Sequence, residues 1–162
     1  PAHPEVPISK AVRAGDFVFT SAYGPWTFDP AKVVFDETGA IVDDGSGPRA
    51  LPVVEIVPDG GFYDYGARYT AGATEFFVPA RLPDEVVAAC AETAVLVHRT
   101  LGLRDLSRSD LIVDADGRPW FLEVNVAPGM TETSTYPQAV AAGGLELGSL
   151  MAALVQIAIA RA

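Results

Sequence analysis

The chain has 162 residues, of which 49% are hydrophobic, so it can bury one sizeable core and is too apolar to be generally disordered. Its 21 acidic and 11 basic side chains give a formal net charge of −10, which disfavours contact with phosphate backbones, so nucleic acid is not an expected partner. Cys90 is the single cysteine, which excludes an intrachain disulfide and a Cys-based zinc site. The N-terminus lacks the pattern of a signal peptide, and the longest apolar stretch, about residues 147–159, is too short to span a bilayer. We therefore expect a soluble, cytoplasmic protein without membrane contacts.

The first half of the chain is predicted to form strands and turns. Two β-prone runs between residues 11 and 20 flank Gly15-Asp16, and residues 33–42 predict a second hairpin with its turn near residues 37–39. Residues 43–49 combine Asp, Gly, Ser and Pro, which interrupt regular structure. We place a domain boundary there, so that a strand segment 1–49 precedes a second domain, residues 50–162.

Residues 50–162 are predicted to form strands that alternate with three helices. The clearest helix runs from Pro83, a residue suited to the first helical position, to Leu101, with Gly102 after its last turn and His98 near the negative end of its dipole. Its apolar positions recur at helical spacing, so one face is expected to pack on a sheet. The other predicted elements are strands at 53–57, 61–65, 75–78, 106–113 and 120–126 and helices at 137–142 and 146–160. The predicted class is α+β, a mostly antiparallel sheet packed by helices with an added N-terminal hairpin segment.

The last predicted helix is apolar nearly all round, with few polar points after Glu146. Such a helix must be buried against the sheet or against another chain. We expect a homo-oligomer, most simply a two-fold dimer, whose interface includes this helix or an N-terminal strand edge. The alternative is a compact monomer in which the N-terminal hairpins cover the helix.

The dipeptide Asp116-Gly117 between two β-prone runs predicts a two-residue type I′ turn. In that register Asp110 faces Glu123 and Arg108 faces Asn125, and side-chain alternation puts all four on one face. Ile112 and Phe121 are predicted to continue this face as an apolar floor. The opposite face is predicted to pack against the 83–101 helix with its apolar side chains, namely Leu111, Val113, Trp120, Leu122 and Val124.

The predicted pair of carboxylates defines a candidate metal site. Directly opposed side chains lie about 4.5–5.5 Å apart at Cβ, and two carboxylates that close stay ionised only with a cation between them. Carboxylate and amide oxygens are hard ligands, which suit Mg²⁺ on substrate phosphates. The alternative is that Asp110 and Glu123 pair with Arg108 at a solvated end of the sheet.

Several segments resemble the D-alanine–D-alanine ligases, a family of ATP-grasp enzymes. The resemblance covers about residues 51–160, and its most specific part is a Glu-x-Asn-x-x-Pro-Gly-Met-Thr string after an upstream Arg-x-Asp. The matching segments occur in family order: FYDYGARY at 62–69, Pro79-Ala80, Arg108-Ser109-Asp110 and LEVNVAPGMTETS at 122–134. The resemblance therefore implies an ATP-grasp C-terminal subdomain that binds ATP and Mg²⁺.

The same resemblance implies roles for individual residues. Asp110, Glu123 and Asn125 would hold Mg²⁺ on the ATP phosphates, and Arg108 and the Gly129 backbone would steady the reaction intermediate. Ser134 and Tyr69 would contact the carboxylate end of the dipeptide. The nucleotide would be contacted by Phe62 and Ile112, which line the adenine slot, and by Arg68 near the phosphates. Arg68 stands where the family more often has Lys, and Gly66 where an acidic residue is common, so both positions depart from the family pattern.

The reaction that the family implies has two steps. A carboxylate attacks the ATP γ-phosphate to form an acyl phosphate, which an amine then intercepts, and both steps depend on positioning and charge neutralisation. The other lobe of the ATP clamp and the domain for the first D-alanine have no match in the chain. Residues 7–21 (PISKAVRAGDFVFTS), followed by Gly24-Pro25, instead resemble the opening strands of the imine/enamine-hydrolysing reactive-intermediate deaminases.

We therefore expect a chimera of two incomplete families, with the deaminase-like segment at about residues 4–48. Three functions follow: a folded chimera without ligase activity of its own, a weak Mg²⁺–nucleotide binder that keeps a half-site, or a ligase that is active when a partner supplies the missing lobe. Deaminase activity is not expected, because the helices and the arginine-bearing strand of that family have no match.

Overall fold

The structure, a computed structural model, describes the backbone of residues 11–14, 17–20, 33–58 and 74–161, and the side chains of residues 38–57 and 74–161. The predicted strand at 61–65 and the candidate residues Phe62, Arg68 and Tyr69 lie outside the described residues. Near the N-terminus the strands β1 (Ala11–Ala14) and β2 (Phe17–Thr20) pair antiparallel, which confirms the first predicted hairpin.

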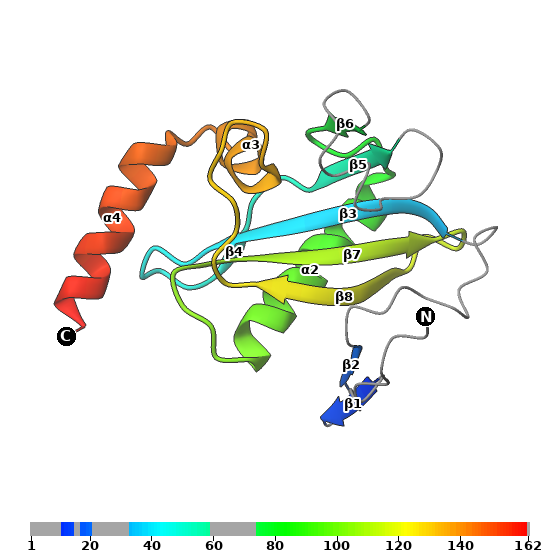
Figure 1. Ribbon diagram of the computed structural model, residues 1–162, viewed down its shortest axis with the longest axis horizontal. Helices are drawn as coiled ribbons and strands as arrows, with labels where there is room; N and C mark the ends of the chain where they lie inside the picture. The colour runs from blue at the N-terminus through cyan, green and yellow to red at the C-terminus, as the bar shows by residue number, and fades with distance from the viewer. Residues whose placement is uncertain (1–10, 15–16, 21–32, 59–73, 162) are drawn as a thin grey trace, which may run out of the picture.

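One antiparallel sheet of six strands organises the rest of the described chain (Figure 1). Its order is β6-β5-β3-β7-β8, with the short β4 paired to the end of β3. The strands are β3 (Val33–Val42), β4 (Arg49–Ala50), β5 (Val54–Pro58), β6 (Thr74–Phe77), β7 (Leu106–Asp114) and β8 (Pro119–Asn125). Helix α2 (Asp84–Thr100) packs on one face, α3 (Thr135–Ala142) packs beside β3 and β5 on the other, and α4 (Leu147–Ala160) lies beside the β3–β4 end of the sheet (Figure 1). The α+β class predicted from the sequence is confirmed.

The predicted long helix is present as α2, and its buried stripe packs on the sheet. Pro83 occupies the N-cap rather than the first helical position, and Asp84 and Glu85 lie in the first turn, where the helix dipole favours negative charge. The apolar core on this face joins α2 to β7 and contains Val53, Ala80, Val86, Cys90, Leu111 and Val113. The stripe is rotated slightly from the predicted one, because Val86 rather than Val87 is buried and Leu101 is exposed.

His98 lies in the last turn of α2, as predicted, but it faces inward. Its Nδ1 is 2.8 Å from the Ser107 hydroxyl of β7, and both side chains are buried. Burial lowers the pKa of His98 below its usual value, although Asp43 and Asp105 oppose the shift. The imidazole is therefore neutral at pH 7 and serves as a core hydrogen-bonding group instead of a charged partner of the helix dipole.

The hairpin predicted within residues 33–42 is wrong, because these residues form the single strand β3. Thr38 pairs with Val54 on one side and Asp110 on the other, so the supposed turn lies in the middle of the sheet. Gly39 has a packing role there: a Cβ at this position would lie 2.6 Å from Ala94 Cβ in α2. The glycine thus permits the close approach of a helix to a strand.

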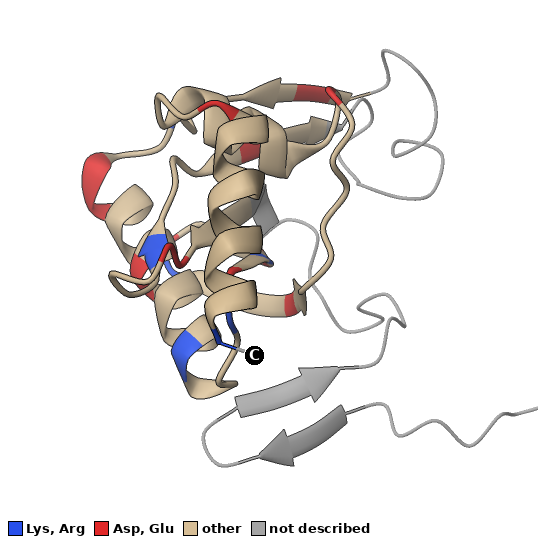
Figure 2. Cartoon of the chain, turned by 90° about the vertical axis from the view of Figure 1, so that its left-hand side faces the viewer, with Lys and Arg blue, Asp and Glu red and all other residues tan. Residues whose placement is uncertain are grey.

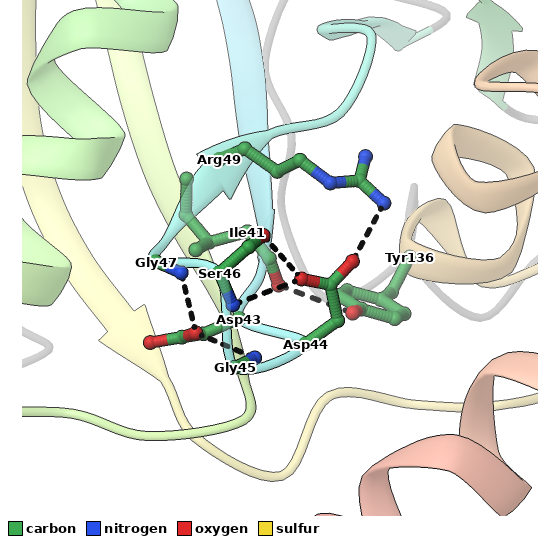
Figure 3. A network of polar contacts seen from close by, with 8 residues as sticks. All are labelled: Ile41, Asp43, Asp44, Gly45, Ser46, Gly47, Arg49 and Tyr136. Atoms are coloured by element: carbon green, nitrogen blue, oxygen red, sulfur yellow. Dashed lines mark hydrogen bonds and ion pairs between the residues drawn. The ribbon is translucent and has the colours of Figure 1, made fainter.

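The segment predicted as a domain boundary is a tight loop that connects β3 to its partner strand β4 (Figure 3). The Asp43 carboxylate accepts hydrogen bonds from the backbone N–H groups of Gly45 and Gly47, at 3.1 and 3.3 Å. The Asp44 carboxylate binds the Ser46 hydroxyl at 2.6 Å and the Arg49 guanidinium at 3.4 Å. Because β3 and β4 pair across this loop, the described end of segment 1–49 belongs to the same sheet as the rest, and the two-segment division stays a prediction.

On the opposite face α3 packs beside β3 and β5, and α4 extends the core at the β3–β4 end of the sheet (Figure 1). Tyr136 of α3 is fully buried and donates its hydroxyl to the Ile41 carbonyl of β3 at 3.1 Å, and burial raises its pKa to about 12 (Figure 3). Glu146 caps α4 by accepting hydrogen bonds from the N–H groups of Gly148 and Ser149. These contacts fix both helices beside a core that contains Ala40, Val42, Leu51, Val54, Tyr136, Ala139, Val140, Leu150 and Leu154.

Only one side of α4 reaches that core. Leu150 and Leu154 are buried, whereas Val155 is 55% and Ile159 63% exposed. Figure 2 views the chain from the α4 side, and no charged residue occurs along the helix. No single helix among the described residues is long and apolar enough to cross a membrane; α3 and α4 reach that composition only together, and they are bent by 99° at their junction.

Candidate functional site

The β7–β8 hairpin brings the four predicted polar residues onto one face. Asp110 pairs with Glu123 and Arg108 with Asn125 in the antiparallel ladder, as the sequence predicts. Directly opposed residues share a face. Leu111 and Val113 belong to the core under α2, so the polar face is the opposite one, where α3 packs beside β3 and β5. Ile112 lies on the polar face and is almost fully buried.

The turn of this hairpin differs from the prediction. Its hydrogen bonds run from Gly117 N to Asp114 O, at 2.9 Å, and from Asp114 N to Arg118 O, at 3.1 Å. Gly117 has φ +78°, so the connection is a three-residue loop with glycine in the left-handed position instead of a two-residue type I′ turn. The Asp114 carboxylate organises the loop by accepting hydrogen bonds from the N–H groups of Asp116 and Arg118, at 3.0 and 2.9 Å.

This loop shifts the pairing near the turn by one residue. Val113 pairs with Pro119 and Ile112 with Trp120, one residue away from the predicted register. A β-bulge then inserts Leu122 between the pairs Leu111–Phe121 and Asp110–Glu123. The bulge compensates for the loop, so the predicted pairs of polar residues form although the predicted turn does not.

The faces of two aromatic residues are therefore exchanged relative to the prediction. Phe121 packs with Leu111 in the core under α2 and does not extend the polar face. Trp120 lies opposite Ile112 on the polar face. Its indole N–H donates to Asp114 Oδ2 at 2.8 Å, and this hydrogen bond is the largest cause that lowers the pKa of Asp114.

The charged part of the face is held by an ion pair. The Arg108 guanidinium donates from Nε to Asp110 Oδ1 and from a terminal nitrogen to Oδ2, both at 2.7 Å. This contact corresponds to the alternative that the sequence left open, in which Arg108 neutralises a carboxylate. An ionised carboxylate has about four lone-pair sites, so both Asp110 oxygens can still accept a cation while Arg108 is bound.

The donors on this face fit a magnesium ion that also binds phosphates. Asp110, Glu123 and Asn125 supply two carboxylates and an amide oxygen, all of them hard ligands. Asn125 Oδ1 is oriented by the Ala127 N–H at 2.9 Å. No group of three or more His, Cys, Asp or Glu side chains is placed to hold a metal in the described part of the chain. A cation here would therefore need phosphate or water oxygens to complete its coordination, which is the usual mode of Mg²⁺.

A buried hydroxyl beside Asp110 also fits a polar ligand. Thr38 of β3 lies directly opposite Asp110 and is 2% exposed. Its Oγ1 and that of Thr135, at the start of α3, have no hydrogen-bond partner among the described residues. Buried polar atoms are normally satisfied, so both hydroxyls are available to a ligand or to water on this face.

The loop after β8 leads back to the same face of the sheet. Gly129 lies against Ser134, the N-cap of α3, since a Cβ at Gly129 would be 2.7 Å from Ser134 Oγ. Ser134 Oγ is 2.8 Å from Thr131 Oγ1, and the Ser134 N–H donates to the Thr131 carbonyl at 2.9 Å. The structure thus brings Gly129, predicted to steady the reaction intermediate, next to Ser134, a predicted substrate contact, at the start of α3.

Comparison with known proteins identifies the family of this chain. Residues 35–156 match the family described as D-ala D-ala ligase C-terminus.

The chain belongs to the D-alanine–D-alanine ligase family.

Curated relatives in this ligase family match most of the chain. It is 41% identical over 139 residues to the D-alanine–D-alanine ligase of Pelotomaculum thermopropionicum, which covers 83% of the chain and 44% of that enzyme. It is 42% identical over 152 residues to the ligase of Oleidesulfovibrio alaskensis, covering 93% of the chain and 48% of that enzyme. The second alignment covers 93% of the 162 residues and therefore reaches into the first 50. The chain spans less than half the length of these relatives.

Solved structures of ligases in this family share the fold of this chain. The D-alanine–D-alanine ligase of Bacillus anthracis, crystallised with ATP, superposes with a TM-score of 0.60 at 29% identity, over 75% of this chain and 38% of that one. The VanG D-Ala:D-Ser ligase of Enterococcus faecalis gives a TM-score of 0.64 at 30% identity, over 75% and 35% of the two chains. The mixed α/β lobe with an antiparallel sheet is therefore the C-terminal ATP-grasp subdomain of these ligases.

Proposed function

We propose that the polar face of the β7–β8 hairpin holds the magnesium–phosphate end of ATP. Asp110, Glu123 and Asn125 are the proposed metal ligands, and Arg108 neutralises charge beside them. Ile112, with Phe62 and Arg68 from outside the described residues, is proposed to contact the nucleotide. The observation that carries the proposal is the pairing of Asp110 with Glu123 and of Arg108 with Asn125 on one face of the hairpin.

The proposed reaction class is the ATP-dependent joining of a carboxylate to an amine, as in the ligases that this chain resembles. Ser134 and Tyr69 are the proposed substrate contacts, and the Gly129 backbone, with Arg108, is proposed to steady the reaction intermediate. The close packing of Gly129 on Ser134 supports a shared location for these two residues. When bound, Mg²⁺ would neutralise charge that develops on the transferred phosphate. The positively charged Arg108 guanidinium lies beside the Asp110 carboxylate, and from this position it can stabilise an acyl phosphate.

We propose further that this chain alone does not join two D-alanine molecules. The described lobe supplies one side of the proposed nucleotide site, so without a second lobe the other side of the nucleotide would be open to water. A partner that supplies a second lobe is the proposed route to an active ligase. A chimeric origin, with a deaminase-like segment at about residues 4–48, remains our proposal and is carried by the sequence resemblance alone. The ligase family match, which begins at residue 35, overlaps the end of that segment.

Equilibrium dialysis of ATP with and without Mg²⁺ tests the half-site. We expect Mg²⁺-dependent binding that weakens about tenfold or more in Glu123→Gln, because this change removes one of two carboxylate ligands. The matched control is Glu92→Gln, an exposed glutamate of α2 on the other side of the sheet. Equal binding by Glu123→Gln and the wild type would refute the proposed site. Phosphate release that depends on both ATP and D-alanine and is lost in Glu123→Gln would refute the proposed inactivity.

A further inference from the structure

Trp120 is an exposed aromatic side chain in a fixed orientation. It is 48% exposed, yet its indole N–H is held by Asp114 Oδ2 at 2.8 Å. Asp114 is fixed in turn by the backbone N–H groups of Asp116 and Arg118. The Arg118 guanidinium carbon lies 5.8 Å from the centroid of the indole. An exposed side chain ordinarily samples several rotamers, so this network preorganises an apolar surface that the core does not use.

Trp120 occupies a definite place relative to the proposed metal ligands. It pairs with Ile112 on the polar face, and Ile112 is two residues from Asp110 along β7, about 7 Å at the usual rise of a strand. In the opposite direction the hairpin leads to Arg108 and Asn125, near the loop that enters α3. A nucleotide with its phosphates at Asp110 and Glu123 therefore has the Ile112–Trp120 row available for its base.

We infer that the Trp120 indole, oriented by Asp114, is a contact surface for the purine base of the bound nucleotide. This inference rests on the proposed function. A flat aromatic base gains dispersion and stacking energy against an indole, and an indole that is already oriented loses little conformational entropy on binding. Arg118 beside the same ring adds a cation near the π-face, which favours electron-rich aromatic partners. Trp120 is thus assigned to base binding, separately from the residues that hold the phosphates.

Fluorescence provides a readout specific to this contact. The chain contains two tryptophans, Trp26 and Trp120, so Trp26→Phe leaves Trp120 as the only indole emitter. This variant is titrated with Mg-ATP and with Mg-tripolyphosphate, which has the phosphates but no base. We expect saturable quenching of Trp120 by Mg-ATP and no quenching by Mg-tripolyphosphate.

Equilibrium dialysis of the same two probes measures the affinity effect. Trp120→Ala is expected to weaken Mg-ATP binding about tenfold or more, as stacking contacts to bases typically do, and to leave Mg-tripolyphosphate binding unchanged. Trp120→Phe keeps a ring and should recover part of the affinity. Asp114→Ala removes the hydrogen bond that orients the indole, and this variant should lose part of the Mg-ATP affinity. The matched control, Leu96→Ala, removes another exposed apolar side chain from the far side of the sheet and should change neither probe.

The outcomes separate this inference from the proposed function. If Mg-ATP binds and Glu123→Gln abolishes that binding, but Trp120 is not quenched and Trp120→Ala binds normally, the inference fails while the phosphate site stands. If Trp120→Ala weakens both probes equally, Trp120 has a structural role and the inference also fails. If the wild type binds neither probe, both proposals are overturned.

Discussion

Replacing Gly39 with alanine should destabilise the protein, although local propensity predicts the reverse. In the interior of a strand or helix, alanine is usually more stable than glycine by about 0.5–1 kcal/mol. Here the new Cβ would lie 2.6 Å from Ala94 Cβ, whereas carbon atoms in contact prefer about 3.5–4.0 Å. Either α2 or β3 must move by about 1 Å, and such overpacking costs about 1–3 kcal/mol.

Urea unfolding followed by circular dichroism measures this cost. In a domain of this size each kcal/mol lowers Tm by about 2–4 °C, so a thermal melt provides a second readout. Ala94→Gly is the matched compensating change, since it removes the opposing Cβ at a cost of about 1 kcal/mol in helix propensity, in addition to the lost burial of a methyl group. The double variant should be more stable than the sum of the single effects predicts, by about 1 kcal/mol or more. Strict additivity, or a stabilising Gly39→Ala, would refute the close packing of α2 on β3.

Two further predictions concern a buried ion pair and the assembly of the chain. Glu55 is 1% exposed and accepts hydrogen bonds from the Arg81 N–H, Nε and a terminal nitrogen at 2.8–3.0 Å, and the Arg81 side chain holds the pKa of Glu55 below its usual value. A lowered pKa stabilises the fold above the unfolded-state value, about 4.3, and this contribution is lost as the pH falls through the folded-state value. Arg81→Ala should therefore destabilise the fold at pH 7, and the gap in unfolding free energy to wild type should narrow below about pH 4 in urea melts; a gap independent of pH would contradict the ion pair. We also propose that the exposed face of α4 mediates a homodimer, so that light scattering gives twice the 17.0 kDa chain mass for wild type and the single mass for Val155→Asp. Leu154→Asp would instead unfold the core, and a concentration-independent monomer mass for wild type would exclude the dimer.

The face that carries the polar residues could be predicted, because successive side chains along a strand point to opposite faces of the sheet. Once two β-prone runs flank an Asp-Gly pair, a hairpin follows, but a one-residue change of register exchanges the faces of the paired side chains. The loop type could not be predicted, since Asp116-Gly117 fits both a two-residue turn and a three-residue loop with Gly117 in the left-handed region. No local signal marks the bulge at Leu122 that compensates for the loop. Consequently the Asp110–Glu123 pair is predicted correctly, while Phe121 and Trp120 are assigned to the wrong faces.

The glycine at position 39 also has two interpretations from the sequence, a turn or a site of close packing. A glycine in a β-prone run predicts a turn, because glycine often interrupts strands, but at Gly39 the small residue is required by the proximity of Ala94, about 55 positions away in sequence. The buried Thr38 hydroxyl beside Asp110 was also missed, because its position depends on the pairing of β3 with β7. Contacts of this kind depend on tertiary structure, and no pattern within a short window encodes them. Phe62, Arg68 and Tyr69 lie outside the described residues, so their roles stay predictions.

The central claim, that one face of the β7–β8 hairpin holds a divalent cation on nucleotide phosphates, can be tested residue by residue. Mn²⁺ can replace Mg²⁺ at oxygen ligands and broadens the NMR signals of nearby nuclei. In the presence of ATP, substoichiometric Mn²⁺ should broaden the amide signals of Asp110, Glu123 and Asn125 first and leave those of α2 sharp. Glu123→Gln should remove this selectivity. Broadening centred instead on the Asp43–Asp44 loop, or equal along the whole chain, would contradict the claim.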